Sequence, residues 1–131
     1  MGLDNGICVK RTPISESIPE MKQFEEDYIA KYNLNYEVCY WRKCWNIRSR
    51  IFDVLTGVFD EEYRIPLTID DIDRIAEVLG SFNSDNWNDD WWSIWTFEEM
   101  EDVLKQQIQN LAVLKRLMQE YELEVYFYDS Y

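Results

Sequence analysis

The chain of 131 residues contains no histidine. Histidine is the usual partner of a catalytic serine or cysteine and the commonest metal ligand, so its absence removes Ser–His and Cys–His catalysis and most transition-metal sites. The sequence also lacks a nucleophile elbow and a glycine-rich phosphate loop. We therefore expect a protein that is not an enzyme and that holds no metal or other cofactor.

Cysteines are few, and long hydrophobic runs are missing. The three cysteines, Cys8, Cys39 and Cys44, fit no disulfide framework, and we expect free thiols in a reducing compartment. No run approaches eighteen apolar residues, and residues 1–6 lack the basic and apolar parts of a signal peptide. We expect a single domain over residues 1–131, located in the cytoplasm and without contact to a membrane.

The charge that is present is segregated. Fifteen carboxylates lie between Asp53 and Asp102 against only Arg64 and Arg74, which gives this segment the whole formal charge of −13. The stretch 41–50 just before it has four basic residues and no acid. Such a field steers some partners and repels others, and a protein this acidic is not expected to bind DNA or RNA directly.

Hydrophobic spacing and capping signals predict strands at both ends of the chain and helices between them. We predict strands over residues 3–11 and 123–129, helices over 21–32, 37–56, 69–80 and from 96 to 121, loops over 13–19 and 81–93, and an acidic connector over 60–66. Pairing the two strands gives an α+β fold, in which about three to four helices pack on a small antiparallel sheet formed by the N- and C-terminal strands.

Two capping boxes mark helix starts, at Thr68–Asp71 and Thr96–Glu99. Their first turns are rich in carboxylates, and Asp70 with Asp73 has a spacing that could hold Mg²⁺ or Ca²⁺. Acids in a first turn also favour the positive end of the helix dipole. We expect solvated capping acids rather than a metal site.

A basic aromatic stretch offers one candidate site. Cations beside indole rings suit a nucleotide, because the cations bind its phosphate and an indole stacks on its base. The candidate ligand-binding residues are Trp41, Arg42, Lys43, Trp45 and Arg48. The competing interpretation is that the tryptophans pack in or beside the core while the basic groups neutralise the acidic half of the molecule.

The acidic loop that follows is interleaved with tryptophan. Its candidate partner-binding residues are Asp85, Trp87, Asp89, Asp90, Trp91, Trp92 and Trp95. The loop could be an ordinary solvated surface. Alternatively, its carboxylates could imitate phosphates and occupy the basic groove of a nucleic-acid-binding protein, with tryptophans as anchors.

Three short motifs resemble a family of small phage and prophage proteins. They are Met1-Gly2-Leu3-Asp4, Tyr40-Trp41-Arg42-Lys43 and the aromatic ending Tyr128-Asp129-Ser130-Tyr131, which is one residue longer here. The chain departs from that pattern at Asn5-Gly6-Ile7, where many relatives continue Met-Tyr-Leu, and in its tryptophan-rich loop. The resemblance implies a virus-encoded accessory protein that acts inside a bacterial cell, and it supplies no catalytic residues.

These observations lead to one functional hypothesis and two rivals. We expect a non-enzymatic antagonist of a bacterial defence system, of the anti-CRISPR or DNA-mimic kind, that binds a host defence protein such as a nuclease or another nucleic-acid-binding protein. The first rival is a sponge that sequesters a nucleotide immune signal with Trp41, Arg42 and Lys43. The second is a structural phage component. The oligomeric state is left open.

Overall fold

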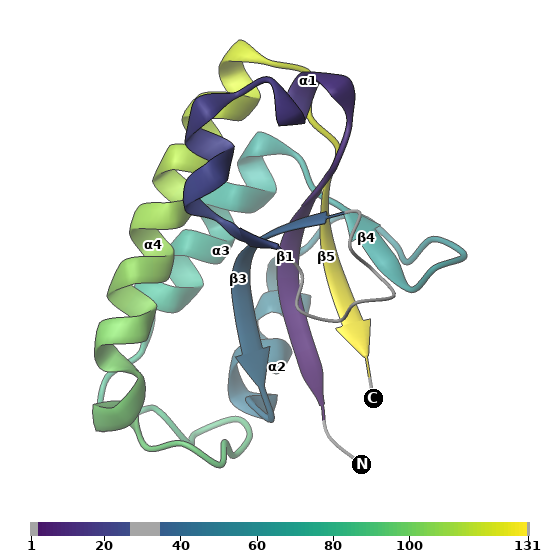
Figure 1. Ribbon diagram of the computed structural model, residues 1–131. Helices are drawn as coiled ribbons and strands as arrows, with labels where there is room; N and C mark the ends of the chain where they lie inside the picture. The colour runs from purple at the N-terminus through teal and green to yellow at the C-terminus, as the bar shows by residue number, and fades with distance from the viewer. Residues whose placement is uncertain (1–2, 27–34, 131) are drawn as a thin grey trace.

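The computed structural model describes residues 3–26 and 35–130, and within them five strands form one antiparallel sheet (Figure 1). The strands are β1 (Asp4–Lys10), β2 (Glu25–Glu26), β3 (Asn35–Arg42), β4 (Arg64–Pro66) and β5 (Val125–Ser130), in the order β2-β3-β1-β5-β4. The predicted pairing of the terminal strands is confirmed, since β1 pairs antiparallel with β5 from Asp4↔Ser130 to Val9↔Val125.

Helices pack against the sheet and against one another. They are α1 (Pro13–Glu16), the 3-10 helix η1 (Pro19–Gln23), α2 (Trp45–Val54), α3 (Ile69–Ser81) and α4 (Phe97–Glu120). Helix α3 lies between α2 and α4 and packs on both. The predicted α+β architecture, with three to four helices on a small antiparallel sheet, is confirmed.

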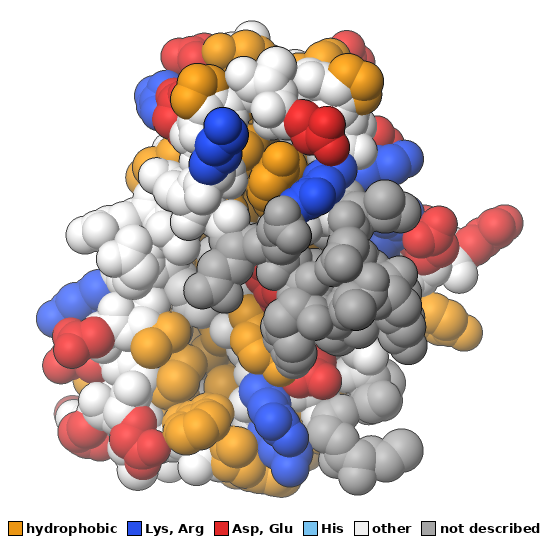
Figure 2. Space-filling view, viewed as in Figure 1, with side chains coloured by type: hydrophobic (Ala, Val, Ile, Leu, Met, Phe, Trp, Pro, Cys, Tyr) orange, Lys and Arg blue, Asp and Glu red, His pale blue; other side chains and the backbone are white. Residues whose placement is uncertain are grey.

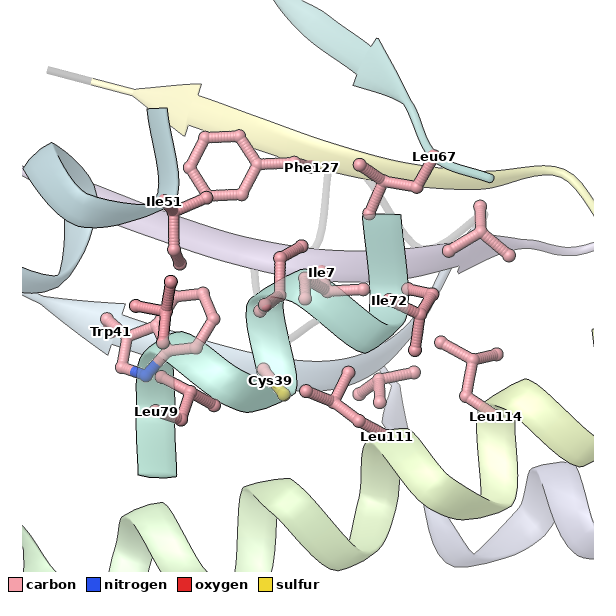
Figure 3. Close-up of a cluster of buried hydrophobic side chains, with 14 of the residues drawn as sticks. Ile7, Cys39, Trp41, Ile51, Leu67, Ile72, Leu79, Leu111, Leu114 and Phe127 are labelled. Carbon is pink, nitrogen blue, oxygen red and sulfur yellow. The ribbon is translucent and has the colours of Figure 1, made fainter. Parts of the chain in front are cut away.

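One hydrophobic core lies between the sheet and these helices (Figure 3). From the strands, Ile7, Trp41 and Phe127 point toward the helices. The helices contribute the opposing layer, which includes Ile51, Ile72, Leu79, Leu111 and Leu114. The alternation of buried and less buried residues in β5 follows from this one-sided packing.

Both predicted capping boxes are present. The Thr68 hydroxyl accepts from the Asp71 backbone N–H at 3.2 Å, and the Asp71 carboxylate accepts from the Thr68 N–H at 2.9 Å. Thr96 and Glu99 make the same reciprocal pair at the start of α4. These bonds satisfy backbone donors that the helices leave unpaired, which is why the starts of α3 and α4 were predictable.

The predicted helix over residues 37–56 is wrong in its first half. Residues up to Arg42 form β3, the chain turns at Lys43, and only Trp45–Val54 is helical. Tyr36, Val38, Cys39 and Trp41 are buried, with a register shift opposite Ile7 and Cys8 that lets consecutive residues of β3 face inward. Because of this shift, buried and less buried residues do not alternate strictly along β3, so its sequence lacks the usual pattern of a strand. Its apolar residues, taken together with those of α2, match helical spacing by coincidence.

Three shorter predictions also differ from the structure. The expected loop over 13–19 contains α1, because Thr12 caps a turn whose first residue is Pro13. The expected helix over 21–32 is replaced by the end of η1 and by β2 as far as residue 26, and residues 27–32 lie outside the described part of the chain. The acidic connector over 60–66 ends in the edge strand β4.

Candidate protein-binding surface

The connection between α3 and α4 is anchored by Trp87. This side chain is buried, and its ring contacts Phe82 and Phe97 at centroid distances of 5.0 and 5.9 Å. Its indole N–H donates to the Trp95 carbonyl at 2.8 Å, and its own carbonyl accepts from the Asn46 amide at 2.8 Å. Trp87 therefore holds the loop to the core and, contrary to the sequence-based expectation, does not face a partner.

Two asparagines shape the first part of the same loop. The Asn83 side-chain oxygen accepts from the backbone N–H groups of Asp85 and Asn86 at 2.9 and 3.0 Å. The Asn86 amide returns a bond to the Ser81 carbonyl at 2.8 Å. Side chains that bond to nearby backbone groups fix a turn without regular secondary structure, so the predicted surface loop is confirmed and is well ordered by its own contacts.

The second part of the loop lies against the junction between β3 and α2. The Ile94 N–H donates to the Lys43 carbonyl at 3.3 Å, and the Trp95 indole N–H donates to the Arg42 carbonyl at 3.1 Å. An isolated bridge also pairs Cys44 with Ser93. These contacts fix the backbone of residues 93–95, so the side chains of these residues start from backbone atoms whose positions are fixed.

Large apolar side chains project from residues 93–95 and from the two residues just before them. Trp91 and Trp92 are 55% and 53% exposed, Trp95 is 39% exposed, and Ile94 is exposed beside them. We name Trp91, Trp92, Ile94 and Trp95 the tryptophan surface. The half-buried Trp45 adjoins it, with its ring centroid 6.4 Å from that of Trp92. Exposed apolar side chains gathered in one place are typical of interaction sites.

Exposed carboxylates precede and follow the tryptophan surface in the sequence. Asp85, Asp89 and Asp90 are exposed in the loop itself, and further exposed acids follow in the first turns of α4: Glu98, Glu99, Glu101 and Asp102. Asp90 forms an ion pair with Arg50 at 2.8 Å, whereas Asp85 and Asp89 take part in no ion pair among the described residues. Figure 2 shows hydrophobic side chains at the lower end of the molecule, with acidic and basic groups beside them.

The basic stretch is not assembled into one site. Trp41 is buried, and its indole N–H donates to the Gln107 side chain at 2.8 Å. Arg48 makes two hydrogen bonds to the Asp129 carboxylate at 2.9 and 2.8 Å and lies over the Phe52 ring. The Arg48 guanidinium also lies 5.9 Å from the Trp45 ring centroid. Arg42 is exposed and Lys43 is half-buried, so of the five predicted ligand-binding residues the buried Trp41 is inaccessible to a ligand and Arg48, although beside Trp45, is already bound to Asp129.

The edge of β3 carries a feature that the sequence did not predict. Amide side chains of α4 bind its carbonyls: Gln107 donates to Tyr40 at 3.2 Å, and Asn110 donates to Val38 at 3.2 Å. An open groove of about 420 Å³ lies alongside, between β3 and α4. Because residues 37–42 were predicted to be helical, no strand edge was expected here, and neither amide was among the predicted site residues.

The cysteines lie in the core. Burial raises the pKa of the Cys44 thiol to about 11, against a smaller opposing effect of its hydrogen bond with Ser93. Burial and, secondarily, the charge of Glu37 raise the pKa of Cys39 far above the ordinary range. Both thiols are protonated near neutral pH and are poor nucleophiles. Among the described residues, no three His, Cys, Asp or Glu side chains are grouped to hold a metal ion.

Comparisons with protein-family models, with curated proteins and with solved structures found no match. In the part of the chain that the structure describes, no helix combines the length and apolar character needed to cross a membrane.

Proposed function

We propose that this protein is a non-enzymatic antagonist that binds a host defence protein through the tryptophan surface. The observation that carries the proposal is the exposure of Trp91 and Trp92 on a segment held on one side by the buried Trp87 and on the other by the contacts of residues 93–95 with residues 42–44. Tryptophan is enriched at binding hot spots, and a pre-ordered backbone lowers the entropy lost on association. A bacterial defence setting is supported by the resemblance to phage proteins.

The acids near the tryptophan surface support one kind of partner. Asp85, Asp89 and the carboxylates of the first turns of α4 give this face a negative field, which favours encounter with a basic surface. Basic grooves are typical of nucleases and other nucleic-acid-binding proteins. The protein would occupy such a groove in place of nucleic acid, with carboxylates where phosphates would lie and indoles as anchors.

The nucleotide sponge has less support. A base needs an accessible aromatic face for stacking, and Trp41 is buried in the core while Arg48 is bound to Asp129. Arg48 lies 5.9 Å from the Trp45 ring centroid, but its bonds to Asp129 occupy the guanidinium, which leaves Arg42 and Lys43 as the cations for a ligand. We therefore retain protein binding as the proposed function.

The test begins with the tagged protein in lysate of a bacterial host, followed by purification of the captured partner. The partner should be a nucleic-acid-binding protein, and surface plasmon resonance should show association that slows as salt is added. The double change Trp91→Ala with Trp92→Ala should raise the off-rate and weaken binding by about 2 kcal/mol or more, as expected for hot-spot residues. Unchanged binding would exclude the tryptophan surface.

A matched control distinguishes the effect of the carboxylates near the tryptophan surface on the association rate from the effect of the total charge of the protein. Asp85→Asn with Asp89→Asn should slow association, whereas Glu77→Gln with Glu122→Gln removes the same charge elsewhere and should have a smaller effect. All four carboxylates are exposed, and none belongs to an ion pair of the described residues. Equal effects of the two pairs, or association that is insensitive to salt, would contradict electrostatic mimicry.

A further inference from the structure

The turn that leads into β4 presents a second, separate group of exposed apolar side chains. Val58 is 80% exposed and Tyr63 is 72% exposed. Phe59 is partly exposed and packs on Phe52, with 5.6 Å between ring centroids. In Figure 1 the loop before β4 projects from the edge of the sheet, on the side away from α4. None of these residues belongs to the tryptophan surface.

Tyr63 has an unfavourable backbone conformation. Its φ angle is 59°, in the left-handed region that side chains with a Cβ seldom adopt. None of the described glycines uses this region, and Tyr63 and Lys43 are the non-glycine residues of the described chain that do. A glycine at position 63 would remove the strain, so the aromatic side chain is present at a cost in stability.

Packing does not compensate for this cost. The Tyr63 ring is mostly in solvent, and among the described residues its hydroxyl makes no hydrogen bond and its ring contacts no other ring. A strained residue whose side chain is mostly exposed, without a hydrogen bond or ring contact among the described residues, is typical of a role outside the fold. Its amphipathic ring is well suited to a binding contact, because tyrosine combines a large apolar area with a polar tip.

Asp60 holds the turn in one shape. Its carboxylate accepts from the backbone N–H groups of Glu62 and Arg64 at 2.9 and 3.0 Å, and its own backbone N–H and carbonyl bond to Arg64 and Tyr63. Burial would raise the pKa of Asp60, but these hydrogen bonds and the Arg64 charge together hold that pKa below its ordinary value. The Arg64 guanidinium also lies 4.2 Å from the Tyr126 ring centroid, which attaches the turn to β5.

We propose that the turn Asp60–Arg64 is a second protein-binding element, which inserts Tyr63 into an apolar pocket with a cationic rim. The charge of the turn argues for that rim, since Asp60, Glu61 and Glu62 are opposed only by Arg64. A nucleic acid is excluded by the same charge. The fixed shape lowers the entropy lost on insertion. The element does not depend on the tryptophan surface and adds to the proposed function.

The first arm of the test needs no partner. Tyr63→Gly removes the ring and the strain together, and Tyr63→Asn keeps a side chain that tolerates the left-handed region. Both variants should unfold in urea at the same midpoint as the wild type or at a higher one. A clearly lower midpoint for both would show that the ring stabilises the fold, which would overturn the proposal.

The second arm identifies the contact. A photo-crosslinking phenylalanine derivative is placed at position 63, or at the exposed position of Ala112 on α4 as a control, and illuminated in lysate of a bacterial host. The derivative at position 63 should give one crosslinked adduct of defined mass, and the derivative at position 112 should not give this adduct. The double change Glu61→Lys with Glu62→Lys should reduce the yield of the adduct at least tenfold. The absence of this adduct, or its persistence after charge reversal, would overturn the proposal.

Purified partner then separates the two surfaces. The protein identified from the adduct should bind Tyr63→Gly at least tenfold more weakly than the wild type. If it binds Tyr63→Gly normally but loses Trp91→Ala with Trp92→Ala, the second element is refuted and the proposed function stands. If it loses only Tyr63→Gly, the turn is the binding element and the tryptophan surface is not.

Discussion

Replacing Gln107 with leucine should destabilise the fold through one buried indole. Gln107 accepts from the Trp41 N–H at 2.8 Å and donates to the Tyr40 carbonyl at 3.2 Å, and both Trp41 and Gln107 are buried. A buried donor without a partner costs about 1–3 kcal/mol. The Tyr40 carbonyl borders the open groove, so water can take the place of the lost amide as its hydrogen-bond donor. Burial of the apolar leucine side chain offsets part of the cost, by roughly 1 kcal/mol. We expect a net loss of about 1 kcal/mol, which is measurable against a typical total of about 5–15 kcal/mol.

Urea unfolding followed by circular dichroism would measure this loss, with Gln106→Leu as the matched control. Gln106 is the exposed neighbour, and its amide bonds only to Asn110 within the described chain, so its replacement should change stability by less than about 0.5 kcal/mol. A double-mutant cycle with Trp41→Phe isolates the indole contribution. Equal stabilities of the two leucine variants, or a cycle without coupling energy, would refute the assignment of Gln107 as the acceptor that stabilises Trp41.

Other predictions follow from the sheet and the core. Gly6→Ala should lower the free energy of unfolding by about 1–3 kcal/mol, because the added Cβ would lie 2.6 Å from the Cys39 carbonyl and from the Tyr128 ring. Urea unfolding measures this loss, and an unchanged midpoint would show that β1 and β3 can separate without cost. Deletion of residues 124–131 removes β5, which lies between β1 and β4, and should abolish cooperative thermal unfolding; a truncated protein that melts like the full chain would contradict the sheet order. At pH 8 only about one Cys44 thiol in a thousand should be ionised, given its pKa of about 11, so a thiol reagent should label it slowly, and faster as the pH rises; rapid labelling at pH 8 without denaturant would show that the thiol is not buried in solution.

The parts of the fold that could be predicted are those fixed by local signals. Thr68 and Thr96 begin helices because each capping box satisfies backbone donors within three residues. The strand near the C-terminus followed from its run of β-branched and aromatic residues. In β3, by contrast, the decisive facts are its pairing with β1 and the register shift near Ile7, which depend on residues far away in the sequence. Local periodicity carries no information about such a partner.

The sequence predicted which residues make up the candidate site, but not which of their side chains are exposed and which are buried. The tryptophans of residues 87–95 are close in sequence, yet Trp87 is buried between Phe82 and Phe97 while Trp91 and Trp92 are exposed. Nothing in the residue types distinguishes an anchor from a contact residue, because only the packed neighbours do. Tyr63 was missed for a similar reason, since its left-handed conformation is set by bonds to Asp60 and Asp129 and leaves no composition signal.

The sheet order has a consequence for how the chain folds as it is synthesised. Strand β4 has β5 as its neighbour in the sheet, and about 60 residues separate the two in the sequence, so residues 64–66 are made long before their partner. β1 can pair with β3 early, but one of its edges stays open until residues 125–130 are made. An open strand edge invites pairing with other chains, so chaperone protection and a low local concentration of nascent chains should raise the yield of native protein.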